Sequence, residues 1–323
     1  MLMVLVLVLL APPLSAAPRK LVPRPRQISY GNGKLPLKGL SISFVSVPLP
    51  EDQFAAAELA SVLSVSVGAR IPVLSGQAMS PAIVLRRTGA VDALPGPDDR
   101  TGPDSRESYE LRIHADGGEI RARSSAGLYY GVQTVRQLVD EEAGAGFLPE
   151  VEIRDWPALP YRGFMMDTSH GALPTEEEIK RQIDFLSRWK ANQYYLYSEA
   201  NIELRGYSLI NPGARYSQEQ IRRIVGYARE RHVDVVPCLE LYGHLHDFFR
   251  VERYADLAAL PHGGEMNPRN PQMQSLLVDW VRQFAALFPS PWFHVGMDEP
   301  WKLEKAGSAL PEASSLENCI SNS

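Results

Sequence analysis

The sequence has few cysteines, no surplus of basic side chains and no apolar run long enough to span a membrane. Two cysteines in 323 residues cannot form a disulfide scaffold. Lys and Arg number 33 against 38 Asp and Glu, a formal net charge of −5, so we expect no nucleic-acid partner. The chain also lacks a glycine-rich loop for a phosphate, so no nucleotide cofactor is implied. The 45% hydrophobic content excludes disorder as the dominant state.

The first segment has the pattern of an export signal. Residues 1–10 are almost entirely Leu, Val and Met, and the small residues of Ala11-Pro-Pro-Leu-Ser-Ala-Ala17 follow. This pattern is typical of a signal peptide, and it is shorter than the ~20 apolar residues of a spanning helix. We expect residues 1–17 to be removed and the protein to be secreted or periplasmic, with no membrane span.

The next part, residues 18–158, changes predicted element type every 10 to 20 residues. Alternating and helical spacings predict strands at 40–45, 82–85, 109–114 and 119–123, and helices at 51–67 and 125–139. No convergent set of titratable side chains lies in this part. We therefore predict an N-terminal α+β domain with a supporting role.

After the two prolines of Asp155-Trp-Pro-Ala-Leu-Pro160, strands and helices alternate. The predicted strands are residues 162–167, 192–197, 233–239 and 292–296, and helices begin after Thr175, Ser217 and Asn270. Four parallel strands with three crossover helices are typical of an α/β barrel or of an open doubly wound sheet. We place this domain at residues 159–306 and an irregular tail at 307–323.

Polar side chains lie at the carboxyl end of each predicted strand or just past it, where α/β proteins place their reactive groups. They are Asp167 and His170, then Tyr197 and Glu199, then Glu240, Tyr242, His244 and His246, and finally His294, Asp298, Glu299 and Trp301. Aromatic rings can stack on pyranose C–H groups, while carboxylates bind hydroxyls and move protons. This set therefore favours chemistry on a sugar.

The adjacent carboxylates Asp298 and Glu299 are the sharpest feature of the sequence. Two carboxylates held together in a partly dry pocket repel each other, which raises the pKa of at least one of them. The expected result is a general acid beside a permanent anion. An isolated Asp-Glu pair is usually a solvated turn, but this one ends an apolar strand.

Several motifs together resemble one known family. Phe293-His-Val-Gly-Met-Asp-Glu299 resembles the His-x-Gly-Gly-Asp-Glu hallmark of glycoside hydrolase family 20, the β-N-acetylhexosaminidases. Shorter matches occur in the expected order from about residue 40 to 301: Gly127-Leu-Tyr-Tyr-Gly131, Asp155-Trp-Pro157, Arg162-Gly163, Asp167-Thr-Ser, Lys190-Ala-Asn192, Val236-Pro237 and Gly243-His244. The resemblance implies an N-terminal α+β domain followed by a (β/α)8 TIM-type barrel, of which this chain supplies about four strands.

The resemblance also implies a mechanism and a set of roles. Glycans with N-acetylhexosamine would be hydrolysed with retention, the substrate's own 2-acetamido oxygen acting as nucleophile. Glu299 would protonate the glycosidic oxygen, and Asp298 would orient the acetamido group. The substrate-binding or bracing residues would be His170, Asp167, Glu199, Glu240, His244, His294 and Trp301. No cofactor or metal is implied.

Some positions depart from the family pattern. His170-Gly171 stands where the family carries Arg-His, so recognition of sugar hydroxyls is expected to differ. Glu199 matches the family's acidic pair only after a one-residue shift. Met297 replaces a glycine and is expected to narrow the pocket floor. Only 24 residues follow Glu299, so we expect a partial barrel.

Two other functions stay open on the residues alone. One is a carbohydrate-binding remnant without turnover, consistent with the short barrel. The other is a metal-dependent barrel hydrolase in which His244 and His246 act with Asp298. Cys238 lies in an apolar strand and is expected to be a packed thiol.

Overall fold

The computed structural model describes residues 21–76, 80–89, 100–139 and 146–299. The predicted signal peptide, Trp301 and the tail 307–323 lie outside the described residues. None of the helices in the described ranges combines the length and the apolar character that a membrane crossing requires.

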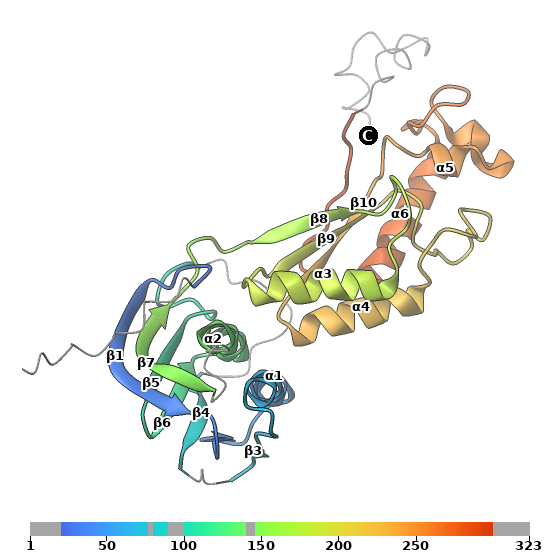
Figure 1. Ribbon diagram of the computed structural model, residues 1–323. Coiled ribbons are helices and arrows are strands. Elements are labelled where there is room, and N and C mark those ends of the chain that lie inside the picture. Colours follow the sequence, from blue (N-terminus) through green and yellow to red (C-terminus); the bar gives the residue numbers. More distant parts are fainter. Residues whose placement is uncertain (1–20, 77–79, 90–99, 140–145, 300–323) are drawn as a thin grey trace, which may run out of the picture.

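A seven-stranded mixed sheet forms the first layer, with two helices on one face (Figure 1). In sheet order the strands are β1 (Gln27–Pro36), β7 (Phe147–Asp155), β5 (Tyr109–His114), β6 (Gly117–Ala122), β4 (Ala82–Arg87), β2 (Ser41–Phe44) and β3 (Val73–Leu74). The helices are α1 (Pro50–Val67) and α2 (Ser125–Leu138). The predicted strands and helices of this part are therefore present.

The core of this layer lies between the sheet and the helices. Period-2 alternation buries Leu111 and Ile113 of β5 and Ile120 of β6 completely, and Val132 and Val135 of α2 pack against them. Three strands of this sheet, β1, β3 and β7, were not predicted. Only one of the ten residues of β1 is buried, whereas β7 buries Val151 and Ile153 at alternate positions.

A three-stranded parallel sheet forms the second layer. Its order is β10 (Asp234–Leu239), β9 (Gln193–Ser198) and β8 (Gly163–Asp167). Helices α3 (Glu176–Arg188), α4 (Gln218–Glu230) and α6 (Pro271–Leu287) follow the strands, and α5 (His246–Phe249) and the 3₁₀ helix η1 (Glu252–Leu257) precede α6. This alternation is the first part of a (β/α) barrel, as predicted.

Helix α4 begins after Ser217, as predicted, and with a capping box. The Ser217 hydroxyl accepts the Gln220 N–H at 3.1 Å, and the Gln220 side chain accepts the Ser217 N–H at 2.9 Å. Thr175 also caps α3 through the Glu178 N–H, but the Glu178 side chain bonds Arg181 and Gln182 instead of returning to the cap. The Thr175-x-x-Glu178 segment therefore forms only one half of a capping box.

The prediction of a fourth strand at 292–296 is wrong. His294 makes one isolated parallel bridge with Cys238 of β10, through its N–H to Pro237 at 2.9 Å and its carbonyl to Leu239 at 3.0 Å. The ladder stops because Gly296 has φ +67° and Met297 φ +71°, which turn the chain out of the extended conformation. The segment still lies beside β10, where a fourth strand belongs.

Strand β8, predicted as a strand at residues 162–167, forms the open edge of the sheet in the described part of the chain. Phe164 and Met165 are 48% and 44% exposed. Strands of a closed parallel barrel are covered on both faces and on both edges. The apolar composition of β8 thus fits a barrel, while the described residues supply only three of its strands.

Buried polar contacts join the two layers. The Lys190 ammonium donates to Asp155 Oδ2 and to the Tyr109 hydroxyl, both at 2.8 Å. Arg162 and Asn192 both contact the carboxylate of Glu107, at 2.5 and 2.8 Å. The motif residues around 155, 162 and 190–192 therefore form the junction that positions the strands of the second layer.

Candidate active site

The carboxyl ends of the three parallel strands meet at one edge of the sheet. Asp167 lies opposite Tyr197, and Tyr197 lies opposite Cys238, so the residues just after these positions are neighbours in space. These residues include His170, Glu199 and His244, and the 296–299 segment approaches from beyond β10. The predicted gathering of polar side chains at one edge is present.

Asp167 and His170 form a tight pair after β8. Asp167 Oδ2 lies 2.7 Å from His170 Nδ1, and Asp167 Oδ1 accepts the backbone N–H groups of Ser169 and His170. Burial alone would raise the pKa of Asp167, but these hydrogen bonds outweigh it and lower the pKa. The hydrogen bond and the charge of Asp167 raise the pKa of His170. The pair orients the imidazole toward Glu199.

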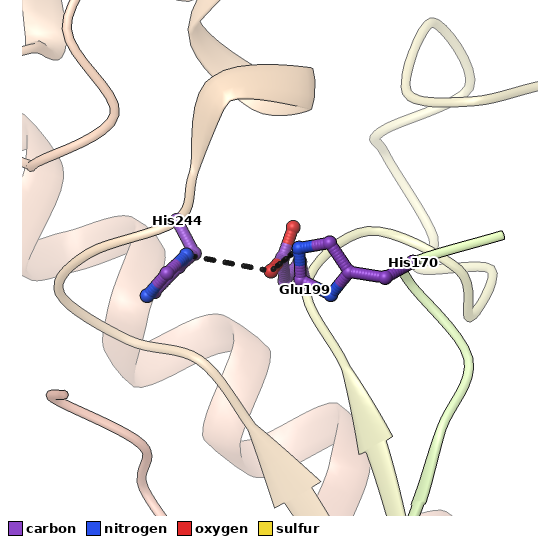
Figure 2. Close-up of side chains that lie close together, drawn as sticks. All are labelled: His170, Glu199 and His244. Atoms are coloured by element: carbon purple, nitrogen blue, oxygen red, sulfur yellow. Dashed lines mark ion pairs between the residues drawn. The ribbon is translucent and has the colours of Figure 1, made fainter. Parts of the chain in front are cut away.

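Glu199 follows β9 and lies between two histidines. Its Oε1 is 3.7 Å from His170 Nε2, 3.8 Å from His244 Nδ1 and 3.2 Å from the Tyr197 hydroxyl that donates to it. Burial raises the pKa of Glu199, while both histidines and Tyr197 oppose that rise. Figure 2 shows the two imidazoles on either side of the carboxylate. Glu199 therefore connects the loops after β8 and β10.

His244 links Glu199 to the adjacent carboxylates. Its Nε2 is 3.6 Å from Glu299 Oε2 and 3.9 Å from Asp298 Oδ2, while Nδ1 faces Glu199. The backbone of His244 has φ +55°, which turns the loop after β10 back over the sheet edge. The predicted support of the Asp-Glu pair by His244 matches this position.

Glu240 is completely buried below the 296–299 segment. Its Oε1 accepts three backbone N–H groups, from Tyr242 at 2.9 Å, Gly243 at 3.1 Å and Met297 at 2.9 Å. Burial raises the pKa of Glu240 to about 7, the backbone donors oppose the rise, and Asp298 adds to it. These contacts join the loop after β10 to the turn before Asp298.

Gly296 lies against Glu240 in a position that excludes a side chain. Its φ is +67°, and a Cβ atom there would collide with the Glu240 carboxylate. The neighbouring Met297 also has positive φ, and its side chain is 51% exposed. The expected narrowing of the pocket floor by Met297 is therefore not observed. Its left-handed backbone instead costs about 1–2 kcal/mol.

Asp298 and Glu299 face the other strand ends, but they are not enclosed. Their side chains are 60% and 53% exposed. The expectation of a partly dry pocket is therefore wrong for the described residues, since only three strands and one bridge surround the pair. Their direction fits the prediction, because both carboxylates approach the His244 ring.

His294 and His246 take positions outside the His170–Glu199–His244 cluster. His294 Nδ1 accepts the Gly296 N–H at 3.2 Å and lies 3.0 Å from Cys238 Sγ, so its contacts hold the turn before the Asp-Glu pair. His246 is exposed and its ring packs on Gly264. The alternative metal set of His244 and His246 with Asp298 is not assembled. Cys238 is buried, as predicted.

The fold and the site together have the features of a class of barrel enzymes. An α+β domain precedes the opening strands of a (β/α) barrel, and carboxylates and imidazoles gather at the carboxyl ends of those strands, as in barrel enzymes. Residues 19–156 match the family model for glycosyl hydrolase family 20, domain 2, and residues 159–313 match the model for its catalytic domain. The chain therefore belongs to glycosyl hydrolase family 20.

Known relatives and solved structures agree with this assignment. A beta-hexosaminidase of Porphyromonas gingivalis is 32% identical over 234 residues, which cover 61% of this chain and 30% of that protein. A chitooligosaccharidolytic beta-N-acetylglucosaminidase of Bombyx mori is 28% identical, with 61% and 37% covered. The chain thus spans about a third of the length of these relatives.

Two solved structures share the fold over nearly the whole chain. The Flavobacterium johnsoniae chitobiase superposes with a TM-score of 0.78 at 23% identity, covering 93% of this chain and 48% of that one. The beta-N-acetylhexosaminidase of Streptomyces coelicolor gives a TM-score of 0.75 at 24% identity, with 93% and 62% covered. At this level of identity the likeness supports the fold alone.

Proposed function

We propose that the protein removes N-acetyl-β-hexosamine residues from glycans by substrate-assisted hydrolysis with retention. The single observation that carries this proposal is the position of Asp298 and Glu299 beside His244, at the edge where three parallel strands end. The beta-hexosaminidase names of the relatives support the substrate class.

The two carboxylates take different parts in the reaction. Glu299 donates a proton to the glycosidic oxygen as the bond from that oxygen to C1 breaks. The carbonyl oxygen of the substrate's 2-acetamido group attacks C1 and forms a cyclic oxazolinium ion. Asp298 accepts the acetamido N–H and stabilises the positive charge that develops on the ring. Glu299, now ionised, takes a proton from the water that opens the ring at C1.

His244 and Glu240 position this pair rather than react. The His244 ring lies within 4 Å of both carboxylates, so a proton on Nε2 stabilises whichever of them is ionised. Glu240 accepts the Met297 N–H and thereby fixes the turn directly before Asp298. Both contacts reduce the number of orientations available to the reacting groups, which is how positioning residues lower a barrier.

The experiment compares two chromogenic substrates on the purified 323-residue chain. We expect hydrolysis of 4-nitrophenyl N-acetyl-β-D-glucosaminide and little hydrolysis of 4-nitrophenyl β-D-glucoside, which lacks the acetamido nucleophile. A Glu299→Gln preparation serves as the control for a contaminating glycosidase and is expected to be inactive. Equal rates on both substrates, or equal rates for both preparations, would contradict the proposed function.

We also propose that the protein is exported. The short apolar run of residues 1–10 and the small residues before Pro18 support this proposal. To test this, the protein is recovered separately from the cytoplasm and from outside it, and its N-terminus is determined by mass spectrometry. A mature chain that starts near residue 18 is expected, and a chain that stays in the cytoplasm with residues 1–17 intact contradicts it.

A further inference from the structure

Two histidines and one glutamate, which are residue types that can bind metals, converge from the ends of three strands. They are His170 after β8, Glu199 after β9 and His244 after β10, and one ligand atom from each lies within 4.8 Å of the others (Figure 2). Glu199 Oε1 is central, 3.7 Å from His170 Nε2 and 3.8 Å from His244 Nδ1. This cluster differs from the His244–His246 pair that the sequence suggested.

The tautomer of His170 is fixed by its neighbour. Asp167 is ionised and can only accept, so the 2.7 Å contact with His170 Nδ1 requires a proton on that nitrogen. In the neutral ring, the lone pair is then on Nε2, the atom that faces Glu199. A carboxylate behind a metal-binding histidine is the usual arrangement in metalloproteins, because it orients the ring and raises the basicity of the ligating nitrogen.

His244 faces Glu199 with its other ring nitrogen and, among the described residues, has no hydrogen-bonded carboxylate behind it. Nδ1 faces Glu199, and Nε2 is a buried atom for which the described residues provide no hydrogen-bond partner. The carboxylate of Glu299 lies behind it at 3.6 Å. A ligand bound at Nδ1 would leave the proton on Nε2, directed at Glu299. A carboxylate therefore lies behind each imidazole of the cluster, within hydrogen-bond distance for His170 but not for His244.

We propose that His170 Nε2, Glu199 Oε1 and His244 Nδ1 form a binding site for a divalent transition metal of the zinc class. Two imidazoles and one carboxylate suit Zn²⁺, Co²⁺ or Ni²⁺, whereas Mg²⁺ and Ca²⁺ prefer all-oxygen sites. Ligand bonds near 2.0–2.1 Å in a tetrahedron place the ligand atoms about 3.3 Å apart. The present atoms lie within 4.8 Å of one another, so metal binding has to draw the three side chains inward. A fourth position stays open to water.

The site has a consequence for the neighbouring carboxylates. A cation bound between His170 and His244 would favour the ionised forms of Asp298 and Glu299. Metal binding would then oppose the proton donation assigned to Glu299. This consequence depends on the proposed function, whereas the metal site itself does not.

The test measures metal binding directly, in the absence of any sugar. The 323-residue chain is stripped with a chelator, dialysed, and titrated with Zn²⁺ by calorimetry and with Co²⁺ by visible absorption. We expect one Zn²⁺ per chain and Co²⁺ bands typical of a four-coordinate site with nitrogen ligands. Because hydrolysis is not measured, failure of the proposed function leaves this result unaffected.

Matched variants identify the ligands. His170→Ala and Glu199→Gln should each weaken Zn²⁺ binding at least tenfold, and Asp167→Asn should weaken it about 10–100-fold through loss of the backing carboxylate. His246→Ala and His262→Ala, which change exposed histidines outside the cluster, should bind like the parent chain. No Zn²⁺ binding by the parent chain, or parent-like binding by folded His170→Ala, would overturn the proposal.

Discussion

Glu240 Oε1 accepts the backbone N–H of Met297 at 2.9 Å, so a buried carboxylate at the end of β10 holds the turn that presents Asp298. The same oxygen accepts the N–H groups of Tyr242 and Gly243. One carboxylate oxygen thus joins the loop after β10 to the segment that carries the Asp-Glu pair. Each proposed role of that pair depends on this connection.

Glu240→Gln is expected to change how stability depends on pH. Burial raises the pKa of Glu240 from 4.5 to about 7 in the folded chain. The contribution of protonated Glu240 to the free energy of unfolding is therefore greatest below about pH 4.5. It is lost as the pH rises through about 7. Glutamine retains the accepting oxygen and does not ionise, so the variant should lose less stability over this range.

Thermal unfolding of both proteins at about pH 5 and about pH 8 measures the Glu240 effect. The melting temperature of the parent should fall more between the two values than that of Glu240→Gln. Glu177→Gln is the matched control, because the Glu177 side chain is 79% exposed on α3. Equal pH dependence in Glu240→Gln and the parent would show that Glu240 does not titrate in this range.

His232 should make the free energy of unfolding depend on pH in the opposite direction. It is buried beside Tyr129. Burial is the main cause that lowers its pKa to about 3, and the positive charge of Arg106 adds to this effect. The unfolded chain takes up a proton below about pH 6.5, so stability should fall as the pH falls from there toward 3. His232→Asn keeps a residue that tolerates φ +57° and should flatten that fall in urea unfolding. An unchanged acid slope in the variant would contradict this assignment.

The junction between the layers should depend on the Lys190–Asp155 ion pair. Both side chains are at least nine-tenths buried, and Asp155→Ala leaves the Lys190 ammonium without its carboxylate. Loss of one partner of a buried pair costs about 3–5 kcal/mol. Urea unfolding should show this loss, and the double variant Asp155→Asn with Lys190→Met should recover part of it. No recovery in the double variant would mean that the uncompensated charge is not the cause.

Asp298→Asn should slow turnover more than it weakens substrate binding. The amide cannot supply the negative charge that stabilises the oxazolinium-like transition state, so kcat should fall about 10²–10³-fold with a smaller change in KM. Steady-state kinetics on 4-nitrophenyl N-acetyl-β-D-glucosaminide measure both constants. A change confined to KM would assign Asp298 to ground-state binding alone.

Local sequence patterns predicted most of the helices and strands because each element carries its own signal. The capping box at Ser217 and the buried stripe of Ile221, Ile224, Val225 and Ala228 in α4 are examples. Residues 292–296 have an equally apolar pattern, yet positive φ values at Gly296 and Met297 end the ladder after one bridge. Pattern alone does not reveal where the backbone turns.

The candidate site was predictable as a set of residues but not as a set of contacts. Strand ends in a parallel sheet share one edge, so the approach of His170, Glu199 and His244 follows from topology. The exposure of Asp298 and Glu299 does not follow from the topology, because the enclosure of a pocket depends on every element around it. In the same way, the sequence suggested that His244 acts with His246, two residues further on, while the fold places it beside Glu199 from another strand.

The most direct test of substrate assistance is a rate comparison across aryl glycosides whose N-acetyl group carries zero, one, two or three fluorine atoms. Fluorine withdraws electrons from the amide oxygen and makes it a poorer nucleophile. If that oxygen attacks C1 while Glu299 protonates the leaving group, kcat/KM should fall steadily with each added fluorine. Rates that do not change across the series would contradict attack by the acetamido group.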